Sequence, residues 1–458
     1  MAEFTKPETF SNLGAISSVD GRFRGNVEEV AKYFSEYATM KNRVELEIEW
    51  LLHINPIIGE KEITEKQETQ LRGIVENFSI KDAQWIEEKD LKINHDTKSA
   101  EYFLRTKLEE LGMEKIAPLV HIGLTSADID DNAIRLSLTR FEKEYLGLAR
   151  EDLMTFLKEL AIEYKDSIFL GKTHGKPAIP TTMGKELANF YHRLRKRDEK
   201  LIDIKFEGKL TGAVGNWNAL SDRYSEVNWQ EVNKDFLQKF DLEPNMFTTQ
   251  ILPYENIIEY LNLLKQYNEV LIDLSKDMWT YISEGYIKIV PKKQEVGSST
   301  MAHKVNPISF EGCQSHLTIA NGMVETLGRN LPSNRLQRDL TDKYLIRELG
   351  YIMANSVLGY SMIYGGINNM EFNSNFAKEE LNNHWEILSE PMQTILRVHG
   401  YQDAYEVIKD KTRGKTLTEE EYLKLVEKLD ISKKAKEELR NLRPEKYVGW
   451  AIDIIEKI

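Results

Sequence analysis

The residue types best suited to hold a negative charge lie between positions 297 and 307, in the run Gly-Ser-Ser-Thr-Met-Ala-His-Lys-Val-Asn-Pro. Gly297 and the serines after it let the backbone bend and offer N–H groups, and Lys304 adds a fixed positive charge. Such a loop can grip a carboxylate or stabilise an oxyanion that develops during a reaction. On composition alone, a solvated connector between two helices is the other interpretation.

Two histidines lie in polar surroundings that suit proton transfer or ligand binding. His174 stands between a threonine and a glycine in a stretch broken by glycine and proline, which is not typical of a helix core. His95 belongs to the string Asn94-His95-Asp96, between two charged helical segments. A lone His beside an Asp is more often a helix cap or a surface pair than a catalyst, so both interpretations stay open for His95.

Helix starts and arginines supply further candidate anion ligands. Thr125 and Ser126 open a helix with an aspartate three residues after the threonine, which predicts an N-cap, and a helix N-terminus also attracts anions. Arg22 ends a turn rich in Asp and Gly, and Arg338 and Arg347 belong to a segment of mixed charge. All three arginines suit anion binding. The alternatives are a plain surface turn for Arg22 and a salt-bridged face for Arg338 and Arg347.

Composition limits the classes of function. The 458 residues are 41% hydrophobic and 29% charged, which is typical of a globular protein of about two to four domains. The net charge of −13 argues against broad nucleic-acid binding, so an anionic substrate needs a local cluster of cations. Apolar runs are too short for a membrane span, and the polar N-terminal stretch does not predict a signal peptide.

The cysteine content limits the possible disulfides, compartment and metal sites. The single cysteine, Cys313, excludes an internal disulfide, fits a reducing, cytoplasmic compartment, and is expected to be a packed thiol rather than a nucleophile. The sequence also contains no metal-ligand cysteine set and no glycine fingerprint for nucleotides. Nothing in it therefore predicts a metal site.

Apolar residues recur at helical spacing along most of the chain, whereas β signals are weak. We expect helices over residues 27–50, 81–92, 100–111, 132–165, 186–204, 256–283 and 342–363, and after Pro307. The helix that begins at 342 is expected to end at Gly365-Gly366. Long stripes separated by short breaks predict an all-α protein built on a helical bundle.

The run at 297–307 resembles the signature loop of the fumarase/aspartase superfamily, G-S-S-x-M-P-x-K-x-N-P, and His303 before the lysine is similar to the adenylosuccinate lyase branch. Further strings follow in the family's order: V-D-G-R-F at 19–23, N-H-D at 94–96, T-S-x-D at 125–128 with His121 upstream, T-H-G-x-P-A at 173–178, G-A-V-G-N at 212–216, T-T-Q at 248–250 and Q-R-D-L-T-D at 337–342. The chain departs from this pattern at Phe23 (for Tyr), Lys172 (for Arg), Lys176 (for Gln), Ala302 (for Pro) and Lys343 (for Ser).

The resemblance implies an all-α, three-domain fold with a long central helical bundle, divided into residues 1–114, 115–366 and 367–458. It implies a homotetramer whose active sites are shared between subunits, and a nucleotide substrate with no metal or organic cofactor. The implied activity is a carbon–nitrogen lyase of purine biosynthesis, which releases fumarate from adenylosuccinate to give AMP and from the succinyl-carboxamide ribotide SAICAR to give AICAR. A sister lyase acting on argininosuccinate and a non-catalytic helical scaffold are the alternatives.

The resemblance also implies roles for individual residues. Ser299 is the implied base and His174 the implied acid, with Glu311 orienting His174. Lys304 and Asn306 would stabilise the developing dianion, and Lys304 must also help Ser299, because an unassisted hydroxyl is a very poor base. The implied substrate-binding residues are Arg22, Phe23, Asn94, His95, Asp96, His121, Thr125, Ser126, Gln250, Met301, Asn306, Arg338, Lys343 and Arg347.

Overall fold

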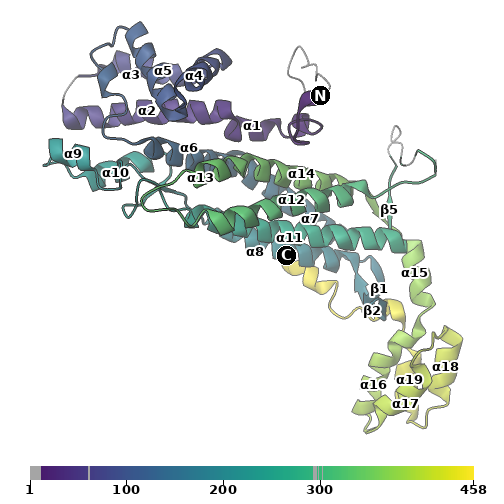
Figure 1. Ribbon diagram of the computed structural model, residues 1–458. Helices are drawn as coiled ribbons and strands as arrows, with labels where there is room; N and C mark the ends of the chain where they lie inside the picture. The colour runs from purple at the N-terminus through teal and green to yellow at the C-terminus, as the bar shows by residue number, and fades with distance from the viewer. Residues whose placement is uncertain (1–11, 60–61, 292–296, 298, 302) are drawn as a thin grey trace. The chain divides into compact units, whose positions relative to one another are not determined.

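The computed structural model of this chain describes residues 12–59, 62–291, 297, 299–301 and 303–458 (Figure 1). Ser298 and Ala302 of the signature loop lie outside the described residues. The chain forms two compact units, of which unit 1 comprises residues 1–150, 199–268 and 316–359, and unit 2 comprises residues 151–198, 269–315 and 360–458. The division into 1–114, 115–366 and 367–458 stays a prediction.

Long helices dominate the described chain, as the apolar stripes predict. The longest are α2 (Glu36–Ile58), α7 (Gly147–Glu163), α8 (Met183–Ile202), α11 (Glu255–Glu284), α12 (Ile308–Asn330) and α14 (Leu349–Asn368). The predicted helix end at Gly365-Gly366 is wrong, because α14 continues to Asn368. A Cβ atom at Gly366 would come within 3.0 Å of the Phe310 ring, so the glycine serves the close packing of α14 and α12 rather than a helix end.

The N-terminal helices of unit 1 have a core of their own. They are α1 (Glu28–Phe34), α2 (Glu36–Ile58), α3 (Glu65–Glu76), α4 (Ile80–Ile93) and α5 (Asp96–Glu110). The buried residues of α2 to α5 form one apolar cluster that includes Leu51, Leu71, Ile86 and Leu104. The helix expected over 27–50 is interrupted at Ser35, where the backbone is extended and the hydroxyl accepts the Ala38 N–H at 3.2 Å, which caps α2.

The remainder of unit 1 begins with α6 (Ser126–Phe141), which passes through a π-helical turn (Glu142–Leu146) into α7. The expected N-cap at Thr125 is confirmed, because its N–H donates to the Asp128 carboxylate at 2.8 Å. Asp128 is also paired with Lys209 at 2.6 Å, and both side chains are fully buried. The other elements are α9 (Asn218–Arg223), α10 (Trp229–Gln238), α13 (Thr341–Leu345), the parallel pair β3 (Glu207–Gly208) and β4 (Glu243–Pro244), and 3₁₀ turns at Asn12–Gly14, Arg24–Asn26, Ala117–Leu119 and Ile346–Glu348.

Unit 2 contains two short antiparallel sheets. One is β1 (Ile168–Thr173) with β2 (Lys176–Thr182), and the other is β5 (Ile287–Ile289) with β6 (Met370–Phe372). The sequence indicated only a glycine and proline break around His174, whereas the structure has a hairpin there. His174 (φ 54°) and Gly175 (φ 70°) form its two-residue turn, and positive φ at both positions matches the twist of paired strands.

The C-terminal part of unit 2 is a group of short helices. These are α15 (Ser374–Asn382), α16 (Ser389–Val398), α17 (Ala404–Thr412), α18 (Glu419–Glu427) and α19 (Lys433–Arg440), with 3₁₀ turns at Trp385–Leu388, Pro444–Lys446 and Asp453–Lys457. They share an apolar core with Leu170 of β1, so the base of the hairpin packs against this group. No helix in the described ranges is both long and apolar enough to cross a membrane.

Candidate active site

One cavity of unit 1, of about 520 Å³, gathers many of the residues that the sequence selected. Its wall combines the start of α5, the start of α6, the segment before α11, and the segment around α13. The predicted residues that line it are Asn94, His95, Asp96, Thr125, Ser126, Gln250, Arg338, Lys343 and Arg347. Strings that lie far apart in the sequence therefore meet at a single hollow, whose size and convergent polar groups suit a small anionic ligand.

The carboxylate of Asp96 is the centre of this wall. It accepts hydrogen bonds from Arg43 Nη2 at 3.0 Å, Lys343 Nζ at 2.6 Å, Arg347 Nη2 at 3.2 Å, and the backbone N–H of Thr97 at 2.9 Å. Burial alone would raise the pKa of the Asp96 carboxyl, but Arg43 and Lys343 outweigh burial and hold the pKa well below its usual range. Asp96, expected to bind substrate, is thus a buried counter-ion for three cations.

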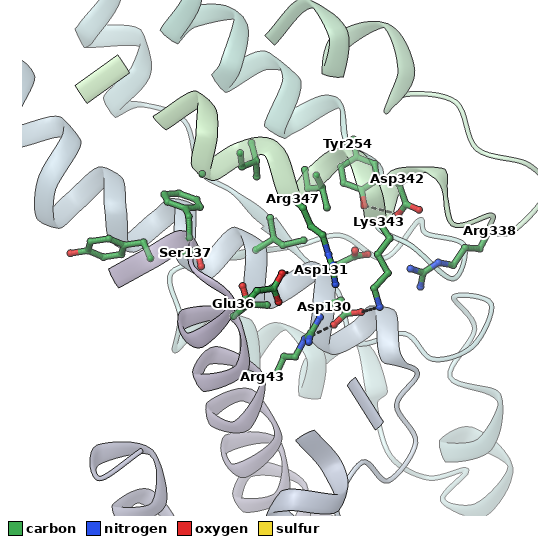
Figure 2. Close-up of a pocket in the computed structure, with 17 residues that line it drawn as sticks. Glu36, Arg43, Asp130, Asp131, Ser137, Tyr254, Arg338, Asp342, Lys343 and Arg347 are labelled. Carbon is green, nitrogen blue, oxygen red and sulfur yellow. Dashed lines mark hydrogen bonds and ion pairs between the residues drawn. The ribbon is translucent and has the colours of Figure 1, made fainter. Parts of the chain in front are cut away.

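Asp130 of α6 shares the same cations. Figure 2 shows Arg43 and Lys343 reaching Asp130, which lies 2.8 Å from Arg43 Nε and 3.5 Å from Lys343 Nζ. Its carboxylate also accepts the Thr97 hydroxyl at 2.9 Å. Sequence reasoning missed Arg43 and Asp130. The available signal was a charged residue beside the apolar stripe of a helix, as at Arg43 next to the buried Val44.

Asp131, which follows Asp130 in α6, holds the segment that carries Gln250. Asp131 accepts the Leu252 N–H at 2.7 Å, and burial raises the pKa of its carboxyl despite the nearby charge of Arg135. The Gln250 side chain donates to a backbone carbonyl at 3.1 Å, and its oxygen accepts from Arg338 Nη1 at 3.5 Å. Gln250 and Arg338 therefore face each other at the cavity wall, and their binding roles stay predictions.

His95 combines both interpretations that the sequence left open. Its Nδ1 accepts the Lys98 N–H at 3.1 Å, so His95 caps α5, and the same side chain lines the cavity. The preceding residue, Asn94, has a left-handed backbone (φ 52°), which turns the chain sharply between α4 and α5. A cap in this position can present its second ring nitrogen to a ligand.

Three predicted binding residues of unit 1 do not line the cavity. Arg22 is exposed, and Phe23 packs edge-on against His316 with 4.9 Å between ring centroids. His121 bonds to the buried Glu47, with 2.6 Å between Nδ1 and the carboxylate. Burial alone would lower the pKa of His121, but Glu47 outweighs burial and raises it, which favours an imidazolium there.

The predicted catalytic residues all belong to unit 2. His174 is exposed at the tip of the β1–β2 hairpin, and Ser299, Met301 and Lys304 are exposed in the signature loop. The side chain of Asn306 donates to the carbonyl of Gly297, which closes this loop at its base. The loop thus presents its hydroxyl and ammonium groups outward.

Glu311 lies in the first turn of α12, where its carboxylate accepts the indole N–H of Trp279 at 3.2 Å. Within the described part of the chain, no hydrogen bond joins Glu311 to His174, so its orienting role stays a prediction.

The expectation for Cys313 is confirmed, because the thiol is fully buried and burial raises its pKa to about 12. The described residues contain no cluster of three or more His, Cys, Asp or Glu side chains placed to hold a metal ion.

Comparison with known proteins agrees with this architecture. The family model described as lyase matches residues 9–322, and the model of the adenylosuccinate lyase C-terminal region matches residues 334–448. The adenylosuccinate lyase of Haemophilus influenzae is 38% identical over 455 residues, which cover 98% of this chain and 99% of that protein. That of Escherichia coli K12 is 35% identical over 452 residues, with the same coverage of 98% and 99%.

Solved structures agree on the fold. The fumarate lyase from Mesorhizobium sp. BNC1 superposes with a TM-score of 0.77 at 17% identity, over 94% of this chain and 97% of that one. The 3-carboxy-cis,cis-muconate lactonizing enzyme from Pseudomonas putida superposes with a TM-score of 0.74 at 16% identity, over 95% of this chain and 97% of that one. The fold is that of the fumarase/aspartase superfamily of lyases. Within it, this chain belongs to the adenylosuccinate lyase family of carbon–nitrogen lyases.

The role of Asp96 predicts a change in acid stability. Because the folded-state pKa lies below the unfolded value of about 4, the Asp96 charge stabilises the fold above that value, and this contribution is lost as the pH falls through the folded-state pKa. In Asp96→Asn, the thermal unfolding midpoint should be lower at pH 7 and should fall less steeply between about pH 5 and pH 2.

The control for this measurement is Glu76→Gln, on an exposed residue at the end of α3. It should keep the midpoint and the acid slope of the unaltered chain. The same midpoint at pH 7 and the same slope in Asp96→Asn would show that the Asp96 charge does not support the fold.

Proposed function

We propose that this chain eliminates fumarate from adenylosuccinate to give AMP, and from SAICAR to give AICAR. The observation that carries the proposal is the cavity in which Arg338, Lys343 and Arg347 meet the helix start at Thr125-Ser126. Cations suit the phosphate that both substrates share, and the N-terminus of α6 suits a carboxylate of the succinyl group. The match to the adenylosuccinate lyase C-terminal model and the names of the relatives support this choice over argininosuccinate and over a non-catalytic scaffold.

Lys343 departs from the family's serine, and its surroundings favour a place in the phosphate subsite. The ammonium is partly buried between Asp96 and Asp130 rather than extended into solvent. It lines the cavity beside Arg338 and Arg347. An entering phosphate would therefore compete with two carboxylates for the same ammonium.

The elimination itself needs a base, an acid, and a group that stabilises negative charge. We propose that Ser299 removes the carbon proton, that His174 protonates the leaving nitrogen, and that Lys304 and Asn306 stabilise the carbanion conjugated to the carboxylate. The outward-facing hydroxyl and ammonium of the signature loop support these roles. Glu311 would orient His174, and this chemistry requires no metal or organic cofactor.

We further propose that the protein is a cytoplasmic homotetramer whose active sites combine residues of different subunits. The support is the exposure of the catalytic candidates in the single chain, both at the hairpin tip (173–177) and in the loop (299–301 and 303–305). Such groups gain the desolvated surroundings that acid–base catalysis needs when another copy covers them.

The function is tested by the release of fumarate from adenylosuccinate, followed with the purified protein and repeated with SAICAR. His174→Ala and Ser299→Ala should each reduce turnover by roughly 10²–10⁴-fold, because each removes one proton-transfer group. Matched substitutions elsewhere in unit 2, His399→Ala and Ser315→Ala, should keep near-normal turnover. Near-normal turnover of a folded His174→Ala or Ser299→Ala variant would remove that residue from the mechanism.

A shared site predicts complementation between two inactive variants. After subunit exchange, tetramers that mix His174→Ala with Ser299→Ala chains should regain part of the activity, because some sites then draw both intact groups from different chains. The composition of the mixed tetramers can be checked by native mass spectrometry. Inactive tetramers of proven mixed composition would indicate that one chain supplies both groups.

Lys343→Ser restores the family's residue and should raise the Michaelis constant for adenylosuccinate with little change in turnover, which is the sign of lost uniform binding. A hydrogen bond to a charged group contributes about 1.5–3 kcal/mol, so an increase of at least tenfold is expected at low ionic strength. The increase should shrink at high salt. Lys343→Arg is the control that keeps the charge, and an unchanged Michaelis constant in Lys343→Ser would exclude a contact with phosphate.

A further inference from the structure

The hairpin that carries His174 is held weakly by its own strands. Pro177 stands opposite Lys172 and Pro180 stands opposite Leu170, and proline has no N–H to donate to a strand ladder. The register also shifts between Leu170 and Lys172, at Gly171. A Cβ atom at Gly171 would lie 2.6 Å from a carbonyl oxygen of β2, so only glycine fits this irregularity.

The tip of the hairpin finds no support in a core. Residues 173–177 are all exposed, whereas Leu170 is fully buried in the apolar cluster of the C-terminal helices. Lys172 lies between the two and is the last partly buried residue before the tip. The position of His174 therefore depends on what holds Lys172.

Two carboxylates hold the Lys172 ammonium. It lies 2.9 Å from Glu284, the last residue of α11, and 3.2 Å from Glu380 of α15. It also lies over the Tyr286 ring, 5.2 Å from the ring centroid. The Tyr286 hydroxyl contacts Glu380 and reaches the Leu170 carbonyl at 3.2 Å, so the same cluster grips the backbone of β1.

The charges make Lys172 the residue on which this cluster depends. Glu284 lies at the C-terminal end of α11, where the helix dipole disfavours a negative charge. Without the ammonium, Glu284 and Glu380 would repel each other beside the hairpin. A lysine or an arginine can satisfy both carboxylates, whereas a neutral side chain of similar length cannot.

We propose that Lys172 is a positioning residue, whose bridge to Glu284 and Glu380 fixes the hairpin that presents His174. Helix α15 thereby takes part in placing the acid of the reaction, although it contributes no group to the chemistry. The inference rests on the role proposed above for His174.

Lys172→Met tests this inference, because it keeps the length of the side chain and removes its charge. It should lower kcat by roughly 10–100-fold, since displacing a reacting group by about 1 Å costs on that order. The Michaelis constant should stay within about threefold, because the binding residues lie elsewhere in the chain. Hydrogen–deuterium exchange should become faster over residues 168–182 and stay unchanged in the other peptides.

Two further variants show whether the charge is what matters. Lys172→Arg, which restores the family's residue, should recover both kcat and the slow exchange of the hairpin. The matched control is Arg193→Met, which breaks a partly exposed ion pair of 2.7 Å with Asp273 in the same unit and should leave kcat unchanged.

A double variant tests the pathway through α15. If Lys172 acts through Glu380, adding Glu380→Gln to Lys172→Met should lower kcat less than Glu380→Gln does in the unaltered chain, because the two effects are not additive. Fully additive losses would overturn the bridge to α15.

Two outcomes would overturn the proposal as a whole. One is an unchanged kcat with unchanged hairpin exchange in Lys172→Met. The other is a loss that Lys172→Arg fails to rescue, with faster exchange throughout unit 2. Faster hairpin exchange together with normal turnover of His174→Ala would instead confirm that Lys172 holds the hairpin, and would remove His174 from the reaction.

Discussion

The cations beside the candidate site of unit 1 are gathered around one buried carboxylate, that of Asp96. Its donors are side chains 53, 247 and 251 positions away in the sequence, on Arg43, Lys343 and Arg347. Three cations this close together would repel one another, and the carboxylates of Asp96 and Asp130 among them offset that repulsion. The cavity for an anionic ligand is thus built around an anion of the chain itself.

This arrangement also reconciles the acidic chain with an anionic substrate. The net charge is −13, yet the cations Arg338, Lys343 and Arg347 are concentrated at one hollow. Asp96 and Asp130 keep them ordered in the absence of ligand, which lowers the conformational entropy that binding would otherwise remove. The carboxylates weaken the attraction of the site for phosphate. In return, the cationic side chains are already ordered before the ligand binds.

The sequence was sufficient where a feature depends on neighbours along the chain. Apolar stripes predicted the long helices, and the Thr-Ser-x-Asp string predicted the N-cap at Thr125, because both depend on residues within a few positions. Residues that lie far apart in the sequence could be assigned to one site only through the resemblance. It supplied Gln250 and Arg338, which stand 88 positions apart and face each other in the structure.

The sequence was not sufficient where distant packing decides the local structure. Gly365 and Gly366 resemble a helix end, but the close approach of the Phe310 ring favours a glycine inside α14 at position 366. The hairpin around His174 was missed because its prolines suggest a loop. Arg43 and Asp130 were missed because each looks like an ordinary charged residue of a helix until its partners are known.

The burial of Cys313 has a practical consequence. The chain has one thiol, which is fully enclosed and holds its proton far above neutral pH. Maleimide and disulfide reagents, which attack thiolates, therefore meet almost no background reaction on the folded protein. A cysteine introduced at any exposed position would carry a fluorophore or spin label alone, without prior removal of native cysteines, so the chain is already suited to single-site spectroscopy.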